Sequence, residues 1–151
     1  MGNWVCWRPP SNGLKLNCDG SCISGFIFGG GVVRERYGFV LLAFSIRLGQ
    51  GTALQEEAKA MHECLKTCKQ RGLNIVEAEI DSLIFHSALK GAGVTPWSII
   101  YVLRKCYNIL VDNTKITHTW REGNMVADYL TSISFPDSEC LVIHDCNSFK
   151  F

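Results

Sequence analysis

The sequence predicts an α/β domain in which a mixed five-stranded sheet, three antiparallel strands followed by two parallel ones, is flanked by helices. Three observations lead to this fold class. The first third of the chain alternates apolar and polar residues between turn signals, which is typical of an antiparallel meander. From residue 52 onward the apolar residues recur at helical spacing. Two later apolar runs are each preceded by a helical segment. Parallel strands require such helical crossovers between them.

Length and composition fit one globular domain. The chain has 151 residues, of which 47% are hydrophobic and 19% charged, so a disordered chain is excluded. The formal net charge of +1 does not by itself predict a nucleic-acid partner. We expect an extended lead-in over residues 1–13, a domain over 14–135 and a C-terminal tail over 136–151.

The meander is predicted from three strands in the first 48 residues. Residues 15–18 alternate toward one face and form the first strand, so Asp19 is expected at its end, where Gly20 favours a turn. Residues 31–36 and 39–48 form the next two strands. The intervening Tyr37-Gly38 pair is typical of a turn between them.

A long helix follows, and its start is signalled by a capping box in which Thr52 is the N-cap and Gln55 the N3 residue. Gly72 ends this helix. The remaining elements are expected in a fixed order: a strand over 75–80, a short helix capped by Ser82 and reaching residue 90, a helix over 97–111, a strand over 115–120 and a last helix that Asn124 could cap.

Four acidic residues lie in four separate segments, each beside a landmark of this fold: Asp19, Glu57, Asp81 and Asp128. Hard divalent cations such as Mg²⁺ prefer carboxylate oxygens as ligands. Two such ions about 3.5–4 Å apart can stabilise both the attacking and the leaving oxygen of an in-line displacement. The four acids are therefore candidate ligands for two metal ions, a pattern typical of nucleases.

Each of these acids also has a purely structural interpretation, which the sequence leaves open. Asp19 could be a turn residue at a strand end, and Glu57 a favourable charge near a helix N-terminus, as Glu56 could be. Asp81 could cap a helix, although Ser82 can fill that role. Asp128 could be an ordinary acid in the first turn of a helix.

The eight cysteines predict neither a disulfide framework nor a zinc site, because no pair has the C-x-x-C spacing. The first residues show no basic start followed by an apolar core, and no apolar run approaches the length of a membrane span. We therefore expect reduced thiols in an intracellular protein of the nucleus or cytoplasm, with no disulfide partner and no membrane.

Five segments together resemble the ribonuclease H fold and, within it, the plant reverse-transcriptase-like ribonuclease H domains of retroelement type. The segments begin at Trp7, Gly29, Glu57, Glu79 and His118. They read W-x-P-P-x-x-G…N-x-D-G, G-G-G-V-V-R, E-A-K-A, E-I-D-S and H-x-x-R-E-G-N-x-V-A-D. Each segment is weak evidence alone, but their order is specific.

The resemblance implies a metal-dependent endoribonuclease that cleaves the RNA strand of RNA–DNA hybrids with two Mg²⁺ ions, Mn²⁺ being possible. The four acids would be the catalytic metal ligands, and His118, which alternates with Ile116 and Trp120, is either an aid to proton transfer or a core residue. The hybrid would be the partner, and we favour a monomer. The expected substrate-binding residues are Gly20, Ser21, Arg121 and Asn124, the last also being a candidate helix cap.

Two departures from the family pattern concern the substrate rather than the metal. Residues 21–28 lack the usual Gly-Asn turn, and Trp120 stands where proline is usual. One alternative is therefore a catalytically weak or inactive nucleic-acid-binding remnant of a retroelement. Another is an exonuclease or integrase-like relative, which the contexts Asp19-Gly20 and Asp81-Ser82 disfavour.

Overall fold

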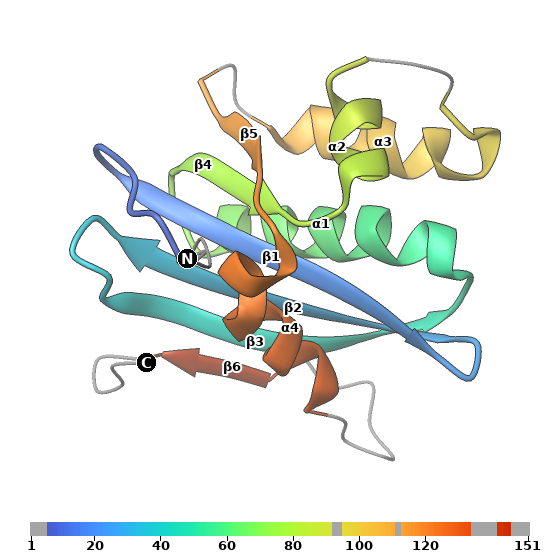
Figure 1. The fold of residues 1–151 in the computed structure, drawn as a ribbon, viewed down its shortest axis with the longest axis horizontal. Helices are drawn as coiled ribbons and strands as arrows, with labels where there is room; N and C mark the ends of the chain where they lie inside the picture. The colour runs from blue at the N-terminus through green and yellow to red at the C-terminus, as the bar shows by residue number, and fades with distance from the viewer. Residues whose placement is uncertain (1–5, 92–94, 111–112, 134–141, 146–151) are drawn as a thin grey trace, which may run out of the picture.

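In the computed structural model, which describes residues 6–91, 95–110, 113–133 and 142–145, one mixed sheet runs through the molecule (Figure 1). Its strand order is β5-β4-β1-β2-β3-β6. The first three strands form the antiparallel meander, and β4 and β5 run parallel to β1. These five strands are β1 (Leu14–Ile23), β2 (Phe26–Glu35), β3 (Val40–Gln50), β4 (Ile75–Ile80) and β5 (Lys115–His118). The predicted fold class is thus confirmed.

The helices cover the two faces of the sheet differently. On one face lie α1 (Ala53–Gln70) and α3 (Trp97–Ile109), with α2 (Leu83–Leu89) close to β5 (Figure 1). On the other face a 3₁₀ turn, η1 (Arg121–Asn124), leads into α4 (Met125–Ser132). This second face is only partly covered, since α4 packs over β1, β2 and β3.

Two helices begin just after the capping residues that the sequence predicted. Thr52 precedes α1, and its backbone N–H donates to the Gln55 side chain at 3.2 Å, while the Gln55 N–H donates to the Thr52 carbonyl at 3.0 Å. Ser82 caps α2 by accepting from the Phe85 N–H at 3.2 Å. Both caps satisfy backbone donors that a helix start leaves unpaired.

Two apolar clusters hold the layers together. The larger one lies between the sheet and the helices α1 and α3, with Leu16, Phe44 and Met61 fully buried. The smaller one joins β2 and β3 to α4 through residues such as Val32 and Leu130. Close packing of α4 needs a glycine beneath it: a Cβ at Gly30 would lie 2.5 Å from the Ala127 carbonyl oxygen. This contact sets the distance between α4 and the sheet.

Several strand ends differ from the sequence prediction, and β2 begins at Phe26 instead of residue 31. β1 does not end at Cys18 but continues to Ile23, because Ser24 (φ 51°) and Gly25 (φ 79°) close a tight hairpin with β2. Asp19 is therefore inside a strand and not in a turn after it. β5 ends at His118, two residues earlier than expected, since the chain turns into η1 just beyond it.

A sixth strand, β6 (Val142–Asp145), pairs antiparallel with β3. It falls within residues 136–151, where a tail was expected; the rest of that stretch lies outside the described residues. The domain boundaries remain a prediction. α3 ends at Ile109, and residue 111, its expected end, is also outside the described part.

The cysteines in the described part of the chain are free thiols, four of them buried: Cys18, Cys64, Cys68 and Cys106. Burial raises the pKa of the Cys106 thiol to about 12, so it behaves as a small apolar side chain. Cys140 and Cys146 lie outside the described residues. Among the helices that are described, none combines the length and the apolar character that crossing a bilayer demands.

Candidate active site

The parallel pairing of β1 with β4 brings two of the predicted acids to the same place. Asn17 lies opposite Glu79 in this ladder, so Asp19 and Asp81, each two residues further on, lie side by side where β4 ends. Glu57, from the second turn of α1, completes the group. One ligand oxygen from each of the three acids lies within 4.8 Å of the others.

A close approach of helix and strand makes this convergence possible. A Cβ at Gly20 would lie 2.6 Å from the Glu56 carbonyl oxygen and 3.2 Å from the Glu57 nitrogen. Any larger residue at this position would therefore push α1, and Glu57 with it, away from Asp19. The structure thus gives Gly20 a packing role; its predicted contact with a sugar stays a prediction.

Burial and mutual repulsion dominate the electrostatics of the three acids. Burial, followed by the charge of Glu57, raises the pKa of Asp19 to about 10. Burial and the charge of Asp81 raise the pKa of Glu57 to about 8. The pKa of Asp81 is also raised by burial, against the opposing charge of Arg121. Such a cluster favours either bound protons or a bound cation.

Asp128, the fourth predicted ligand, lies half-buried in the first turn of α4. It is not one of the three acids with the mutual 4.8 Å spacing, but its side chain is near enough to the Asp19 carboxyl to affect its pKa. Its charge also raises the pKa of both Asp19 and Asp81. Asp128 therefore lies beside the group of three, at its α4 side.

The donor set fits a hard divalent cation. All the candidate ligands are carboxylates, which are the ligands Mg²⁺ prefers, and three of them are already close enough to share an ion. The raised pKa values show that the protein alone compensates these charges poorly. A cation would remove that repulsion.

His118 lies at the rim of the acidic group, as the last residue of β5. Its Nε2 is 3.2 Å from the Asp81 backbone oxygen, and its half-buried ring lies edge-on to Trp120, with 5.4 Å between ring centroids. A second histidine, His86 of α2, has its ring centroid 6.0 Å away. This position is near the site but does not test the catalytic role, which stays a prediction.

The other predicted substrate contacts differ in their accessibility. Ser21 lies on β1 two residues beyond Asp19, and its buried Oγ has no hydrogen-bond partner among the described residues. Arg121 is exposed and its charge acts on Asp81. Asn124 is only 1% exposed. Its Nδ2 donates to the Cys18 carbonyl at 2.7 Å, and although it precedes α4 its side chain does not cap that helix.

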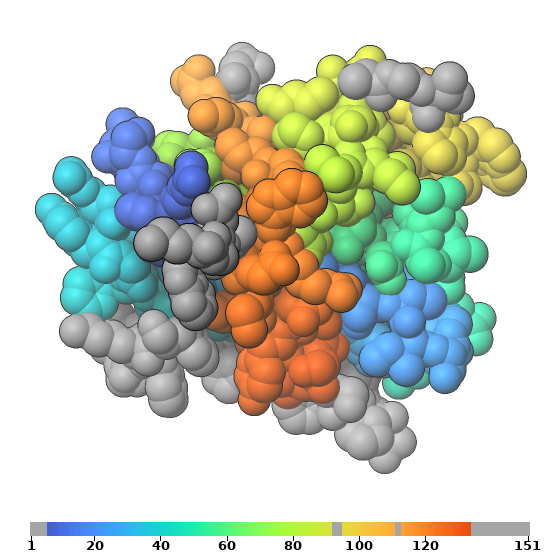
Figure 2. Space-filling model, viewed as in Figure 1, coloured from blue at the N-terminus to red at the C-terminus, as the bar shows by residue number. Residues whose placement is uncertain are grey.

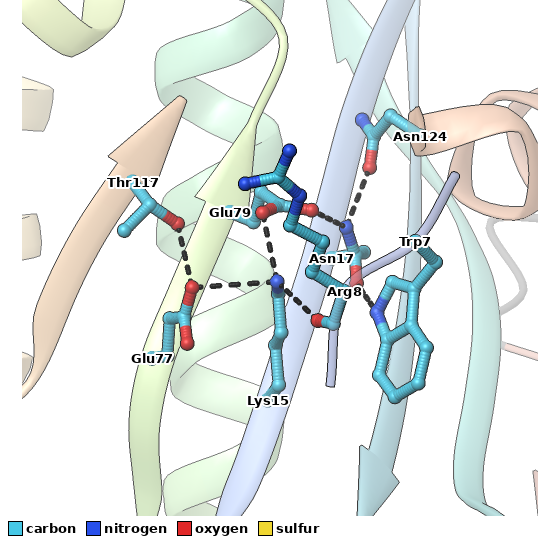
Figure 3. A network of polar contacts seen from close by, with 8 residues as sticks. All are labelled: Trp7, Arg8, Lys15, Asn17, Glu77, Glu79, Thr117 and Asn124. Atoms are coloured by element: carbon cyan, nitrogen blue, oxygen red, sulfur yellow. Dashed lines mark hydrogen bonds and ion pairs between the residues drawn. The ribbon is translucent and has the colours of Figure 1, made fainter. Parts of the chain in front are cut away.

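A group of buried polar residues next to the acids was missed by the sequence analysis. Lys15 and Asn17 of β1 contact Glu77 and Glu79 of β4, and Asn17 also contacts Asn124 (Figure 3). A signal for them was present, because positions 15, 17 and 19 share one face of an alternating strand. Which partners they would meet could not be read from that alternation.

The segments that carry the site meet on one face of the molecule. In the space-filling view, η1 and α4 (orange) border the β1–β2 hairpin (light blue) and α2 (yellow-green) (Figure 2). Trp120, just before η1, and Met125 and Tyr129 of α4 expose 60%, 65% and 63% of their surface. Large apolar side chains exposed together beside an acidic centre are consistent with a surface that contacts a ligand.

Comparison with known proteins identifies relatives of this chain. The family described as reverse transcriptase-like matches residues 17–133. The Arabidopsis thaliana protein named "Putative ribonuclease H protein At1g65750" is 29% identical over 136 residues, which cover 87% of this chain. The chain spans only 22% of the length of that relative.

Several solved structures have a similar fold. Ribonuclease H1 from the halophilic archaeon Halobacterium salinarum gives a TM-score of 0.72 at 24% identity, covering 78% of this chain and 92% of its own. LC11 ribonuclease H1 in complex with an RNA/DNA hybrid gives 0.70 at 23% identity, with the same coverage of 78% and 92%. The prototype foamy virus protease–reverse transcriptase gives 0.63 at 21% identity over 83% of this chain and 21% of its own. At these identities the likeness establishes the fold.

Proposed function

The chain belongs to the reverse transcriptase-like family with the ribonuclease H fold, and from that premise we propose that it is a metal-dependent endoribonuclease cleaving the RNA strand of RNA–DNA hybrids. One observation carries the proposal: Asp19, Glu57 and Asp81, from three separate elements, converge within 4.8 Å in a partly buried site. Buried acids brought together without a cation cost stability, so a role in metal binding accounts for them better than a structural one.

In the proposed mechanism the protein holds the reacting groups in place. Asp19, Glu57 and Asp81 would hold divalent ions, with Asp128 completing the set at the α4 side. Two bound Mg²⁺ ions would supply an activated water and stabilise the leaving 3′ oxygen. The packing of α1 against Gly20 keeps Glu57 at the distance that this requires.

Substrate recognition is proposed to rest on the groups around the acids. Exposed Arg121 is suited to a phosphate oxygen, and the unpaired Oγ of Ser21 to a hydroxyl or phosphate of the bound strand. His118, beside Asp81, would move a proton to or from the reacting oxygens. An intracellular, reducing setting in the nucleus or cytoplasm is part of the proposal, because the described cysteines are free and mostly buried.

Cleavage of a labelled RNA–DNA hybrid tests the function directly. We expect cleavage with Mg²⁺ or Mn²⁺ and none with a chelator. Asp81→Asn, which removes a charge with almost no change in shape, should abolish cleavage and leave the circular dichroism spectrum unchanged. Double-stranded DNA of the same sequence serves as the control substrate.

The same assay separates the enzyme from an inactive remnant. If the wild-type chain binds the hybrid but cleaves nothing with either metal, the remnant alternative is correct. If Asp81→Asn cleaves as fast as the wild type, Asp81 has no catalytic role and the assignment of the site is wrong.

A further inference from the structure

A buried polar network lies along β1 and β4, just before the positions of Asp19 and Asp81 on these strands. Figure 3 shows its residues. Lys15, 1% exposed, forms ion pairs with Glu79 at 2.8 Å and Glu77 at 3.3 Å, and donates to the Arg8 carbonyl at 2.7 Å. Thr117 of β5 donates to Glu77 at 3.0 Å. Among the described residues, no buried side-chain polar atom of this network lacks a partner, so the network is a rigid part of the fold.

Asn17 lies at the centre of this network with its amide fully used. Its Nδ2 donates to Glu79 at 2.9 Å and to the Oδ1 of Asn124 at 3.1 Å, while its Oδ1 accepts from the indole Nε1 of Trp7 at 2.9 Å. An indole can only donate, and an ionised carboxylate can only accept. Trp7 and Glu79 therefore fix which end of the Asn17 amide faces each neighbour.

The orientation of Asn17 in turn fixes the orientation of Asn124. Because Nδ2 of Asn17 donates to the Asn124 oxygen, the Asn124 nitrogen must point the other way. There it donates to the Cys18 carbonyl at 2.7 Å, and the side chain of Asn124 also acts on the nearby Asp81 carboxyl, lowering its pKa against the effect of burial. A flipped Asn124 amide would instead place its oxygen against the Cys18 carbonyl oxygen, which can only accept, and its nitrogen against the donating Nδ2 of Asn17.

Contacts with two cations hold Trp7, the first residue in this series of hydrogen bonds, in place. Its ring packs against two cations, with the Arg34 guanidinium carbon 4.9 Å and the Lys15 ammonium 5.8 Å from the ring centroid. Such contacts between a cation and an aromatic face are attractive. The lead-in segment that carries Trp7 therefore packs onto the same sheet face as the network.

We infer that Asn17 is a positioning residue of the acidic centre: together with Trp7 it orients the Asn124 amide, which holds Asp81 and the Cys18–Asp19 backbone in place to bind a divalent ion. This inference rests on the proposed metal-dependent function and adds to it a role for the lead-in. Residues that hold metal ligands in position typically contribute about 10–100-fold to metal affinity or activity.

The test measures Mg²⁺ affinity separately from stability and from cleavage. The apparent Mg²⁺ dissociation constant is obtained from the rise in melting temperature across an Mg²⁺ titration, since a ligand that binds the folded state stabilises it. Asn17→Leu keeps the branched shape and the number of heavy atoms but removes all three hydrogen bonds, and we expect about tenfold weaker Mg²⁺ binding or more. Trp7→Phe removes the indole donor but keeps an aromatic ring for the contacts with Arg34 and Lys15, and a smaller, few-fold weakening is expected.

Two control variants identify nonspecific effects. Trp97→Phe makes the same substitution at a tryptophan that is 86% exposed on α3, and should leave Mg²⁺ affinity unchanged. Leu103→Ala opens a cavity in the core on the other sheet face. It should lower the melting temperature at every Mg²⁺ concentration without changing the dissociation constant.

A double-mutant cycle then shows whether Trp7 affects Mg²⁺ binding through Asn17 or independently of it. If Trp7 acts through Asn17, adding Trp7→Phe to Asn17→Leu should weaken Mg²⁺ binding no further, whereas independent effects would multiply. Unchanged Mg²⁺ affinity in Asn17→Leu, or an equal loss in Leu103→Ala, would overturn the inference. So would a wild-type chain that Mg²⁺ does not stabilise. A wild type that binds Mg²⁺ but cleaves no hybrid overturns only the proposed activity.

Discussion

Two clusters of charged and polar residues lie next to each other along β1 and β4, yet their charges are balanced in opposite ways. In the network around Lys15, one buried cation meets two carboxylates, and each amide has complementary partners. In the acidic centre, three carboxylates lie within 4.8 Å, and burial and repulsion raise the pKa of Asp19 to about 10. The charges of the first cluster are compensated within the folded protein. Those of the second are not, and a bound cation would compensate them.

The comparison shows how the same strands can serve stability and function within a few residues. β1 contributes Lys15 and Asn17 to the paired network and Asp19 to the acidic centre, all on one face. β4 contributes Glu77 and Glu79 to the network before it ends at the acidic centre. We infer that the paired network supports the strand ends, so that the repelling acids are held together until a metal binds.

The largest effect is expected from removing the cation of the paired network. Lys15→Met would leave Glu77 and Glu79 without their buried partner, and breaking a buried ion pair in this way costs roughly 3–5 kcal/mol. Urea denaturation of Lys15→Met and of the exposed-site control Lys69→Met would measure the difference. A loss below about 1 kcal/mol would show that water compensates the two carboxylates, as it does at exposed ion pairs.

The next prediction concerns which acid of α1 belongs to the centre. Glu57→Gln should reduce hybrid cleavage by roughly 10³-fold, corresponding to about 4 kcal/mol of lost transition-state stabilisation. Its neighbour Glu56 carries the same charge but is not one of the three converging acids. Glu56→Gln should therefore retain most activity, and equal losses in both variants would contradict the assignment of Glu57.

A gain in stability is expected when one acid of the centre is neutralised without metal. The pKa of Asp19 is raised in the folded state to about 10, so its contribution to stability is present below pH 4 and is lost as the pH rises toward 10. In chelator, Asp19→Asn should thus be more stable than the wild type at pH 7, on the order of 2 kcal/mol. The difference in the free energy of unfolding between the two proteins should increase from pH 4 to pH 8.

Metal should reverse the order of these two proteins. Saturating Mg²⁺ stabilises the wild type by ligand linkage and Asp19→Asn less, because a ligand is lost. Melting temperatures at matched ionic strength, with Mg²⁺ and with chelator, provide the measurement. If Asp19→Asn is less stable than the wild type in chelator, the acids do not repel each other as the structure indicates.

The smallest effect is expected in the salt dependence of binding. Phosphate contacts release counterions, so hybrid affinity should fall as salt rises, with a slope of about −0.9 per neutralised phosphate in a log–log plot. Arg121→Gln should reduce that slope by about one if this exposed arginine meets a phosphate. An affinity that is independent of salt would point to another class of ligand.

Much of this molecule could be predicted from the sequence because its signals are local. Thr52 and Gln55 predicted the start of α1, and the alternation of apolar and polar residues between turn signals predicted the meander. The acids were found by their place beside strand and helix ends. The four separated acids were expected to converge, and Asp19, Glu57 and Asp81 lie within 4.8 Å of one another. Local spacing determines such features because helices and strands have fixed periods.

Features that depend on contacts between residues distant in the sequence were determined only by the tertiary structure. The hairpin at Ser24-Gly25 placed Asp19 inside a strand, and the packing of Gly20 against Glu56 set the position of Glu57. Asn124, expected as a substrate contact or helix cap, is instead buried against Cys18, a residue 106 positions away. A sequence states which groups can donate and accept, but only the folded chain determines which of them meet, because burial requires each polar group to find a partner.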